Sequence, residues 1–164
     1  MKRSALVAAL GVSVLAGLVC VSRPAAAAEK PADDVQTIEK TLPFTETEQK
    51  VGVKVGEVTI DSVRIRNWPD HEDFIKGEKD LNDKHSVYVE FTYSNRNLDN
   101  DYKCRYVVRV PGKEKDSLYA QDDRIATLSK GKIGDTNKVQ IKMRTHEYKL
   151  AKTMKLSFEI WRKR

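Results

Sequence analysis

The sequence is poor in cysteine and lacks internal repeats and the common catalytic motifs. Its 164 residues include two cysteines, too few for a disulfide-dense scaffold, and no segment of about 20–50 residues recurs, which excludes a solenoid. No G-x-S-x-G turn, P-loop or dinucleotide-binding fingerprint is present. The carboxylates of Asp122 and Asp123 cannot act as a pair on a strand, because neighbouring side chains there point to opposite faces. We therefore expect no enzyme and no cofactor.

The first 28 residues have the layout of a secretory signal peptide. Lys2 and Arg3 precede an apolar run of 17 residues from Ala5 to Val21, and alanines at 26–28 place small side chains where a signal peptidase cuts. Glu29 would then begin the mature chain. Because the run is shorter than the ~20 residues that span a bilayer, we predict cleavage, secretion or export to the periplasm, and no transmembrane segment in the mature protein.

A lipid anchor is the alternative to a free mature chain. Cys20 closes the apolar run, as a lipidated cysteine would, but bacterial lipidation sites have Gly, Ala or Ser before the cysteine and this chain has Val19. No twin-arginine pair is present, which favours the general secretory route. We expect export without lipid anchoring at Cys20.

Removal of the signal peptide changes the charge balance. The full sequence has 30 bases and 24 acids, a net charge of +6, whereas residues 1–28 contain three bases and no acid, so the mature chain has a net charge of +3. Residues 29–80 hold 13 acids and 8 bases, and residues 81–164 hold 11 acids and 19 bases. Basic charge is therefore concentrated in the second half of the mature chain.

Two regions follow the signal peptide. Residues 29–49 are polar and acidic, contain two prolines and show no sustained period, so we predict a flexible leader in which only a short helix at Asp33–Lys40 could form. From residue 50 to residue 164, hydrophobic and polar residues alternate repeatedly, which is typical of half-buried strands. This second region is the predicted folded domain.

The alternation recurs in about seven short segments of this domain, and no stretch of ten or more residues has a helical apolar stripe. The segments are 51–55, 58–65, 87–93, 102–110, 125–128, 139–143 and 154–160. They predict an all-β fold, an immunoglobulin-like two-sheet antiparallel sandwich. The phase slips at Asp61 and Ser62, which indicates a bulge or a strand that crosses between sheets. Cys104 has the inward phase of Tyr106, so we expect a buried, inert thiol.

The order of these elements resembles a bacterial domain family. The opening V-G-x-x-x-G-x-V-x-I-x-S-V from Val51 to Val63, the strand VYVEFTYSN that ends at Asn95, and the turn SKGKIGD before KVQIKM carry the resemblance. They resemble the small immunoglobulin-like domains of exported proteins and lipoproteins. The resemblance implies an extracytoplasmic binding or structural module with no particular ligand; the loop between Trp68 and Lys84 is an insertion that the family pattern does not require.

Two polar segments could be taken for metal sites. The loop Trp68–Phe74 contains a histidine and three acids, and His85 and His146 complete three histidines, but their spacing matches no zinc motif. Alternating Asn and Asp in Asn95–Asp101 lack the glycine and glutamate of a calcium-binding loop and suit a hairpin turn. We expect turns at both places and no metal.

Outward-facing cations in the later strands are the main candidate for a binding site. These strands are expected to share one sheet, which would bring cations and aromatic rings to one face, a combination suited to anionic polymers. The predicted face consists of Lys103, Arg105, Arg109, Lys138, Lys142, Arg144, Lys155, Tyr88 and Trp161. Such cations could instead serve solubility and protect strand edges.

For an exported protein, envelope polysaccharide, lipid headgroups or an acidic protein are the expected partners, and nucleic acid is not. The leading hypothesis is a non-enzymatic binding module that uses the basic face. The alternatives are a structural or accessory subunit of an envelope assembly, whose edge strand pairs with another chain, and a small hydrolase centred on Asp70–Asp73.

Overall fold

The computed structural model describes residues 35–66 and 84–164. The predicted signal peptide, the start of the predicted leader and the loop that contains Trp68–Phe74 lie outside the described residues. In the described part of the chain no helix is long and apolar enough to cross a membrane.

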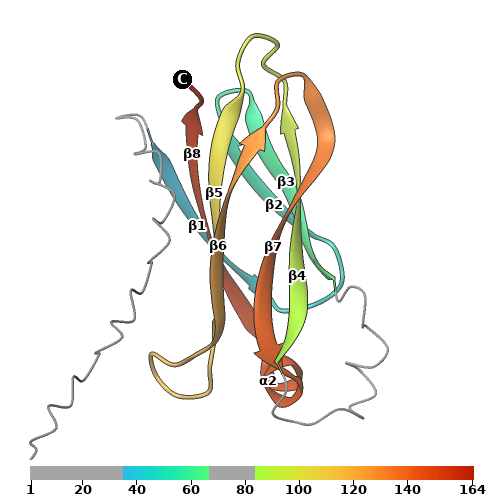
Figure 1. Cartoon of the computed structure of the whole chain (residues 1–164), viewed down its shortest axis with the longest axis vertical. Coiled ribbons are helices and arrows are strands. Elements are labelled where there is room, and N and C mark those ends of the chain that lie inside the picture. Colours follow the sequence, from blue (N-terminus) through green and yellow to red (C-terminus); the bar gives the residue numbers. More distant parts are fainter. Residues whose placement is uncertain (1–34, 67–83) are drawn as a thin grey trace, which may run out of the picture. The chain divides into compact units, whose positions relative to one another are not determined.

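The described residues form eight strands and one short helix, arranged as two four-stranded antiparallel sheets packed face to face (Figure 1). The first sheet has the order β1-β8-β5-β6 and the second has the order β2-β3-β4-β7. The elements are β1 (Gln36–Pro43), β2 (Gln49–Val55), β3 (Val58–Arg66), β4 (Lys84–Asn95), β5 (Tyr102–Pro111), β6 (Leu118–Leu128), β7 (Lys132–Arg144), α2 (Thr145–Leu150) and β8 (Thr153–Arg162). The predicted all-β two-sheet sandwich is confirmed, with eight strands instead of about seven.

Alternation of apolar residues explains the core, because each strand turns one side toward the opposite sheet. Val87, Val89 and Phe91 of β4 are almost completely buried, as are most inward residues of the other predicted strands, whereas Val55 and Tyr102 are only half-buried. Phe91 stacks on Tyr106 of the first sheet at 4.6 Å between ring centroids and meets Phe158 edge-on at 5.7 Å. Such pairs contribute about 0.5–1.5 kcal/mol beyond burial, so this aromatic cluster joins the two sheets.

The phase slip in β3 is a bulge and not a crossing between sheets. Ile60 pairs with Tyr93 and Ser62 pairs with Thr92, so Asp61 is an extra residue in β3. The chain continues in the same sheet on both sides of the bulge. The bulge therefore explains why Val63 and Ile65 again face the core.

The predicted flexible leader is wrong for residues 36–43. These residues form β1, an edge strand that pairs with β8 along its whole length, from Gln36 opposite Ile160 to Pro43 opposite Thr153. The expected helix is not formed by the described part of this segment. Only Ile38 and Leu42 of β1 pack against the core, and both are half-buried. The other interactions that hold β1 are backbone hydrogen bonds to β8. Hydrophobic periodicity in the sequence carries no information about these bonds.

Cys104 lies in the core, as its phase predicts, and is a free cysteine with no exposed surface. Burial raises the pKa of its thiol far above the ordinary value, and the thiolate is the reactive form. The mature protein should therefore not react with a thiol reagent such as dithionitrobenzoate, and one thiol per chain should become reactive in denaturant. A fast reaction of the folded protein would contradict this assignment.

Candidate functional site

The nine residues predicted to form one face lie on two different sheets. Five belong to β5 and β8 of the first sheet, and four belong to β4 and β7 of the second: Lys103, Arg105, Arg109, Lys155 and Trp161, against Tyr88, Lys138, Lys142 and Arg144. The prediction of a single face is therefore wrong. Alternation tells to which side of its strand a residue points, but the chain passes from the first sheet to the second between β6 and β7.

The outer face of the first sheet has nearly balanced charge. The strand register places four bases and three acids on it: Lys103, Arg105, Arg109, Lys155, Glu39, Asp123 and Glu159. Arg105 contacts two of these acids, with Nε 2.7 Å from Asp123 Oδ2 and Nη1 3.7 Å from Glu159 Oε1. Because neighbouring acids already oppose these bases, the face attracts an added anion weakly.

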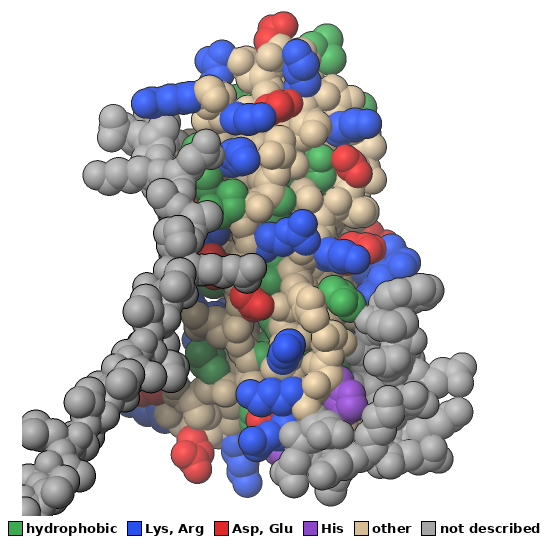
Figure 2. Space-filling view, in the orientation of Figure 1, with side chains coloured by type: hydrophobic (Ala, Val, Ile, Leu, Met, Phe, Trp, Pro, Cys, Tyr) green, Lys and Arg blue, Asp and Glu red, His purple; other side chains and the backbone are tan. Residues whose placement is uncertain are grey.

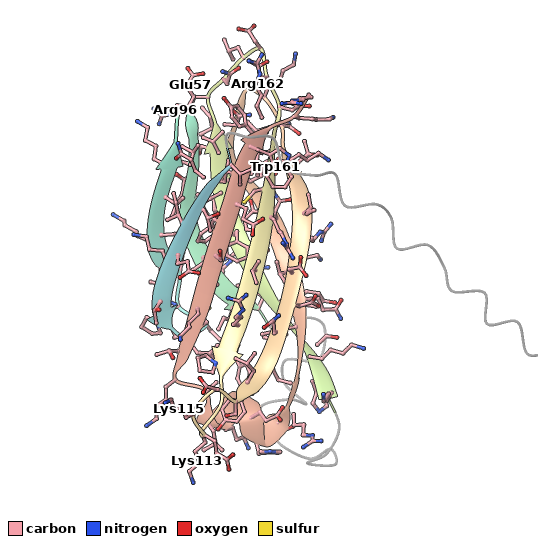
Figure 3. All side chains as sticks on the ribbon, turned by 90° about the vertical axis from the view of Figure 1, so that its left-hand side faces the viewer. Glu57, Arg96, Lys113, Lys115, Trp161 and Arg162 are labelled. Carbon is pink, nitrogen blue, oxygen red and sulfur yellow. The ribbon has the colours of Figure 1, made fainter. Side chains whose placement is uncertain are left out.

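Trp161 does not offer its ring to a ligand. The residue lies opposite Lys103 in the register and has the predicted outward phase, but it is 6% exposed. Figure 3 places it beside Arg162 near the end of β8. Val107 and Ser157, which are paired on the same face, are also buried. The prediction that Trp161 is exposed is wrong. Strand alternation tells to which side of the sheet a side chain points, but not how much of it other residues cover.

The outer face of the second sheet, which we call the basic sheet face, carries a large excess of positive charge. The register, the bulge and the hydrogen bond from Ser62 Oγ to Glu48 place eight bases and three acids there: Lys50, Lys54, Arg64, Arg66, Lys84, Lys138, Lys142 and Arg144, with Glu48, Asp61 and Glu90. Figure 2 looks toward β6 and β7, one strand from each sheet, and Lys and Arg side chains are visibly more frequent than Asp and Glu in that view. Anions are attracted most strongly where such a one-sided charge collects.

A row of charged residues crosses the middle of this face. Arg64, Glu90 and Lys138 are register neighbours on β3, β4 and β7. Arg64 donates from Nε and Nη2 to Glu90 Oε1, at 2.8 Å and 2.5 Å. The Nε atom of Arg66 lies 3.6 Å from the same carboxylate oxygen. The carboxylate of Glu90 thus lies near two arginines. Together, Arg64, Arg66, Lys138 and Glu90 have a net charge of +2.

The adjacent row places an aromatic ring among these cations. Tyr88 lies between Arg66 and Gln140 in the register, and Lys138 Nζ lies 4.9 Å from the centroid of the Tyr88 ring. The Gln140 amide donates to Ser86 Oγ at 2.6 Å. The Tyr88 ring therefore lies among basic side chains of β3 and β7.

The arrangement suits recognition of carboxylate, sulfate or phosphate groups. A guanidinium has five N–H donors in a fixed plane, and the carboxylate of Glu90 engages two nitrogens of Arg64. The remaining donors of Arg64 and Arg66 are available to an external anion, for which arginine is the best-suited side chain. Arg64 and Arg66 remain substantially exposed, at 38% and 47% of their side-chain surfaces.

Five bases of the basic sheet face were not among the predicted site residues: Lys50, Lys54, Arg64, Arg66 and Lys84. Two of them could have been predicted from the sequence, because the alternation in residues 58–66 already places Arg64 and Arg66 on the outward side of the strand. Four of them fall in the acidic stretch of residues 29–80, and Lys84 follows the loop. Counting charge along the sequence therefore missed charges that the sheet collects in space.

The described residues offer no metal site. No three His, Cys, Asp or Glu side chains among them lie close enough to hold an ion. His85 is on β4 and His146 is on α2. The loop Trp68–Phe74, including the acids at 70–73, lies outside the described residues, so the hydrolase hypothesis is not tested.

The Asn95–Asp101 segment uses its polar side chains to fold its own turn. Asn95 is completely buried and donates from Nδ2 to the carbonyls of Asn100 and Leu128, at 3.1 and 2.9 Å. Asn97 Oδ1 accepts from the backbone N–H groups of Asp99 and Asn100. The predicted turn is present, but the predicted hairpin is wrong, because the segment connects β4 of the second sheet to β5 of the first. The Asn95 amide also links the end of β4 to the end of β6.

No protein-family model, curated protein or solved structure matches the chain. The resemblance to immunoglobulin-like exported domains therefore stays a prediction. The functional argument depends on the residues of the basic sheet face alone.

Proposed function

We propose that the mature chain is an exported, non-enzymatic binding module that engages an anionic partner through the basic sheet face. The partner would be an envelope polysaccharide, lipid headgroups or an acidic protein. The observation that carries the proposal is the cluster of Arg64, Arg66 and Lys138 around a single carboxylate, Glu90, in the middle of a face with eight bases and three acids.

Solubility alone explains this distribution less well. A surface that only keeps a protein soluble is best served by charges of both signs interspersed, which is the arrangement on the first sheet. The two sheets belong to one sandwich, yet the second has a formal excess of five bases on its outer face and the first has an excess of one. The contrast supports a ligand for the second sheet.

The alternative, an assembly subunit that adds a partner strand, has less support from the sheet edges. β2 carries a bulge beside Lys50, and β1 ends at Pro43; bulges, lysine and proline all hinder strand addition. On the other side of the sandwich, the Arg124 guanidinium donates to the carbonyl of Lys138 at 3.0 Å and connects the edge strands β6 and β7. Concentration-dependent oligomers in analytical ultracentrifugation would favour the alternative.

Binding to a polyanion should weaken steeply with salt. If a chain of dextran sulfate is bound by about four cations of the face, its affinity should fall roughly 50-fold between ~50 and ~200 mM NaCl, because each neutralised charge releases a counterion. The measurement is titration of labelled dextran sulfate with the protein from residue 29 to 164 at several salt concentrations. An affinity that does not change with salt would contradict the proposal.

A further inference from the structure

A groove opens on the basic sheet face where β2 and β3 are both irregular. It has a volume of about 640 Å³ and is lined by Glu48, Lys50, Gly52, Asp61, Ser62 and Thr92. Thr92 is two residues from Glu90 on the same side of β4, and Ser62 is two residues from Arg64 on β3. The groove therefore lies next to the cluster of Arg64, Arg66 and Lys138, which we call the arginine cluster.

Paired irregularities of the two strands create this groove. Lys50 pairs with Ser62 and Val53 pairs with Ile60, so two residues of β2 lie opposite one residue of β3. Asp61, the bulged residue, is also extra with respect to β4. Bulges occur beside functional sites because they redirect side chains and interrupt the regular surface of a sheet.

Gly52 keeps the groove open. Its φ is +62°, in the left-handed region that favours glycine. A Cβ atom placed there would have no neighbour within 4 Å, so the residue faces open space. The backbone of β2 can thus approach a ligand at this point without an intervening side chain.

The groups in the groove suit hydroxyls better than anions. Ser62, which is 8% exposed, donates from Oγ to Glu48 Oε1, and Asp61 Oδ2 accepts a 2.7 Å hydrogen bond from Ser94 Oγ. Each carboxylate has further lone pairs that can accept hydrogen bonds from a ligand, while Lys50 supplies donors. Two carboxylates repel an anionic group, whereas a hydroxyl both donates and accepts.

We infer that the groove binds a hydroxyl-rich sugar unit while the arginine cluster binds a nearby anionic group, so that the ligand is an acidic polysaccharide. Ser62 and Arg64 are two residues apart, about 7 Å along the strand, so a sugar chain in the groove can also reach the arginine. This inference rests on the proposed function and names its ligand class. Polyglutamate and a surface of phosphatidic acid have the charge but not the adjacent hydroxyls, so charge alone would hold them.

The first test compares polymers with the unmodified mature protein. Polygalacturonate, which carries hydroxyls and carboxylates, should bind at least about tenfold more tightly than poly-L-glutamate of equal charge at the same ionic strength. Equal, salt-dependent affinities would overturn the sugar assignment and leave the proposed function intact. Tighter binding to vesicles of anionic phospholipid than to polygalacturonate would also overturn it. No binding to any of the three would remove the proposed function together with this inference.

The second test removes two acids from the groove and asks whether the affinity for a polyanion rises or falls. The double variant Glu48→Gln, Asp61→Asn makes the face more positive, so simple electrostatics requires tighter binding to every polyanion. The inference requires about tenfold weaker binding to polygalacturonate together with unchanged or tighter binding to poly-L-glutamate. The single variant Glu39→Gln, on the outer face of the first sheet, is the control for loss of an acid and should leave the preference unchanged. If the double variant binds both polymers more tightly, the sugar unit does not occupy the groove.

Discussion

Reversal of two charges on the basic sheet face, by Arg66→Glu and Lys142→Glu, is expected to weaken dextran sulfate binding by about 100-fold or more. Arg66 and Lys142 are exposed, lie on the strands that flank β4, and do not contribute to the core. A hydrogen bond to a charged group is worth about 1.5–3 kcal/mol, so loss of two contacts alone accounts for this factor. Repulsion by the new carboxylates adds to it. The measurement is the titration described for the salt series, at low ionic strength.

The matched control is the double variant Arg109→Glu, Lys155→Glu. These two exposed residues are paired directly across β5 and β8 on the first sheet, and their reversal changes the net charge by the same amount. The control should reduce affinity only a few-fold, through the long-range field. Equal losses in the two double variants would show that net charge, and not the basic sheet face, determines binding. Unchanged melting temperatures would show that both variants are folded.

The substitution Asn95→Asp is expected to destabilise the fold by about 3–5 kcal/mol at neutral pH, the cost of an uncompensated buried charge. The Asn95 amide donates two hydrogen bonds to backbone carbonyls in a fully buried position. A carboxylate there would face two carbonyl oxygens without a proton to donate. Burial raises the pKa of such a carboxyl above its unfolded value, so the protonated form is favoured in the folded state. The loss should therefore be smallest in acid and increase as the pH rises above about 4.

Asn97→Asp is the matched control, because the same chemical change there keeps the side-chain oxygen that accepts hydrogen bonds. Asn97 Oδ1 accepts two backbone hydrogen bonds, which a carboxylate oxygen also accepts. The amide group of Asn97 donates to the carboxylate of Glu57 at an exposed position, so the loss should stay near 1 kcal/mol. Urea unfolding of both variants from about pH 4 to 7 measures the difference. Equal destabilisation by the two substitutions would contradict the role assigned to the Asn95 amide.

Much of the fold could be predicted because burial follows strand period. The inward residues of β4, Val87, Val89 and Phe91, are all buried, and Cys104 lies in the core as expected. The bulge at Asp61 produced a visible slip in the same pattern. β1 was missed because its burial is slight: Ile38 and Leu42 are the only residues of β1 that pack on the core, so its hydrophobic signal is weak.

The site was predicted only in part, and the error concerned sheet membership. Lys138 and Lys142 do lie on the basic sheet face, with Tyr88 near them, but Arg105 and Lys155 lie on the other sheet. The groove could not have been predicted from spacing alone. It needs the bulge of β2 to lie beside that of β3, and only strand pairing establishes this.

The amino-acid order by itself determined which side of each strand is apolar, because successive side chains point to opposite faces wherever the backbone is extended. It thereby determined the core, the two-sheet class of fold and the outward direction of each cation. Only the tertiary structure decided which outward cations are neighbours. Pairing partners are chosen by long-range hydrogen bonds and by the short connections, such as the one at 129–131, that carry the chain from one sheet to the other. As a result, Arg64, early in the domain, lies two strands from Lys138, and an acidic stretch of sequence supplies half of a basic surface.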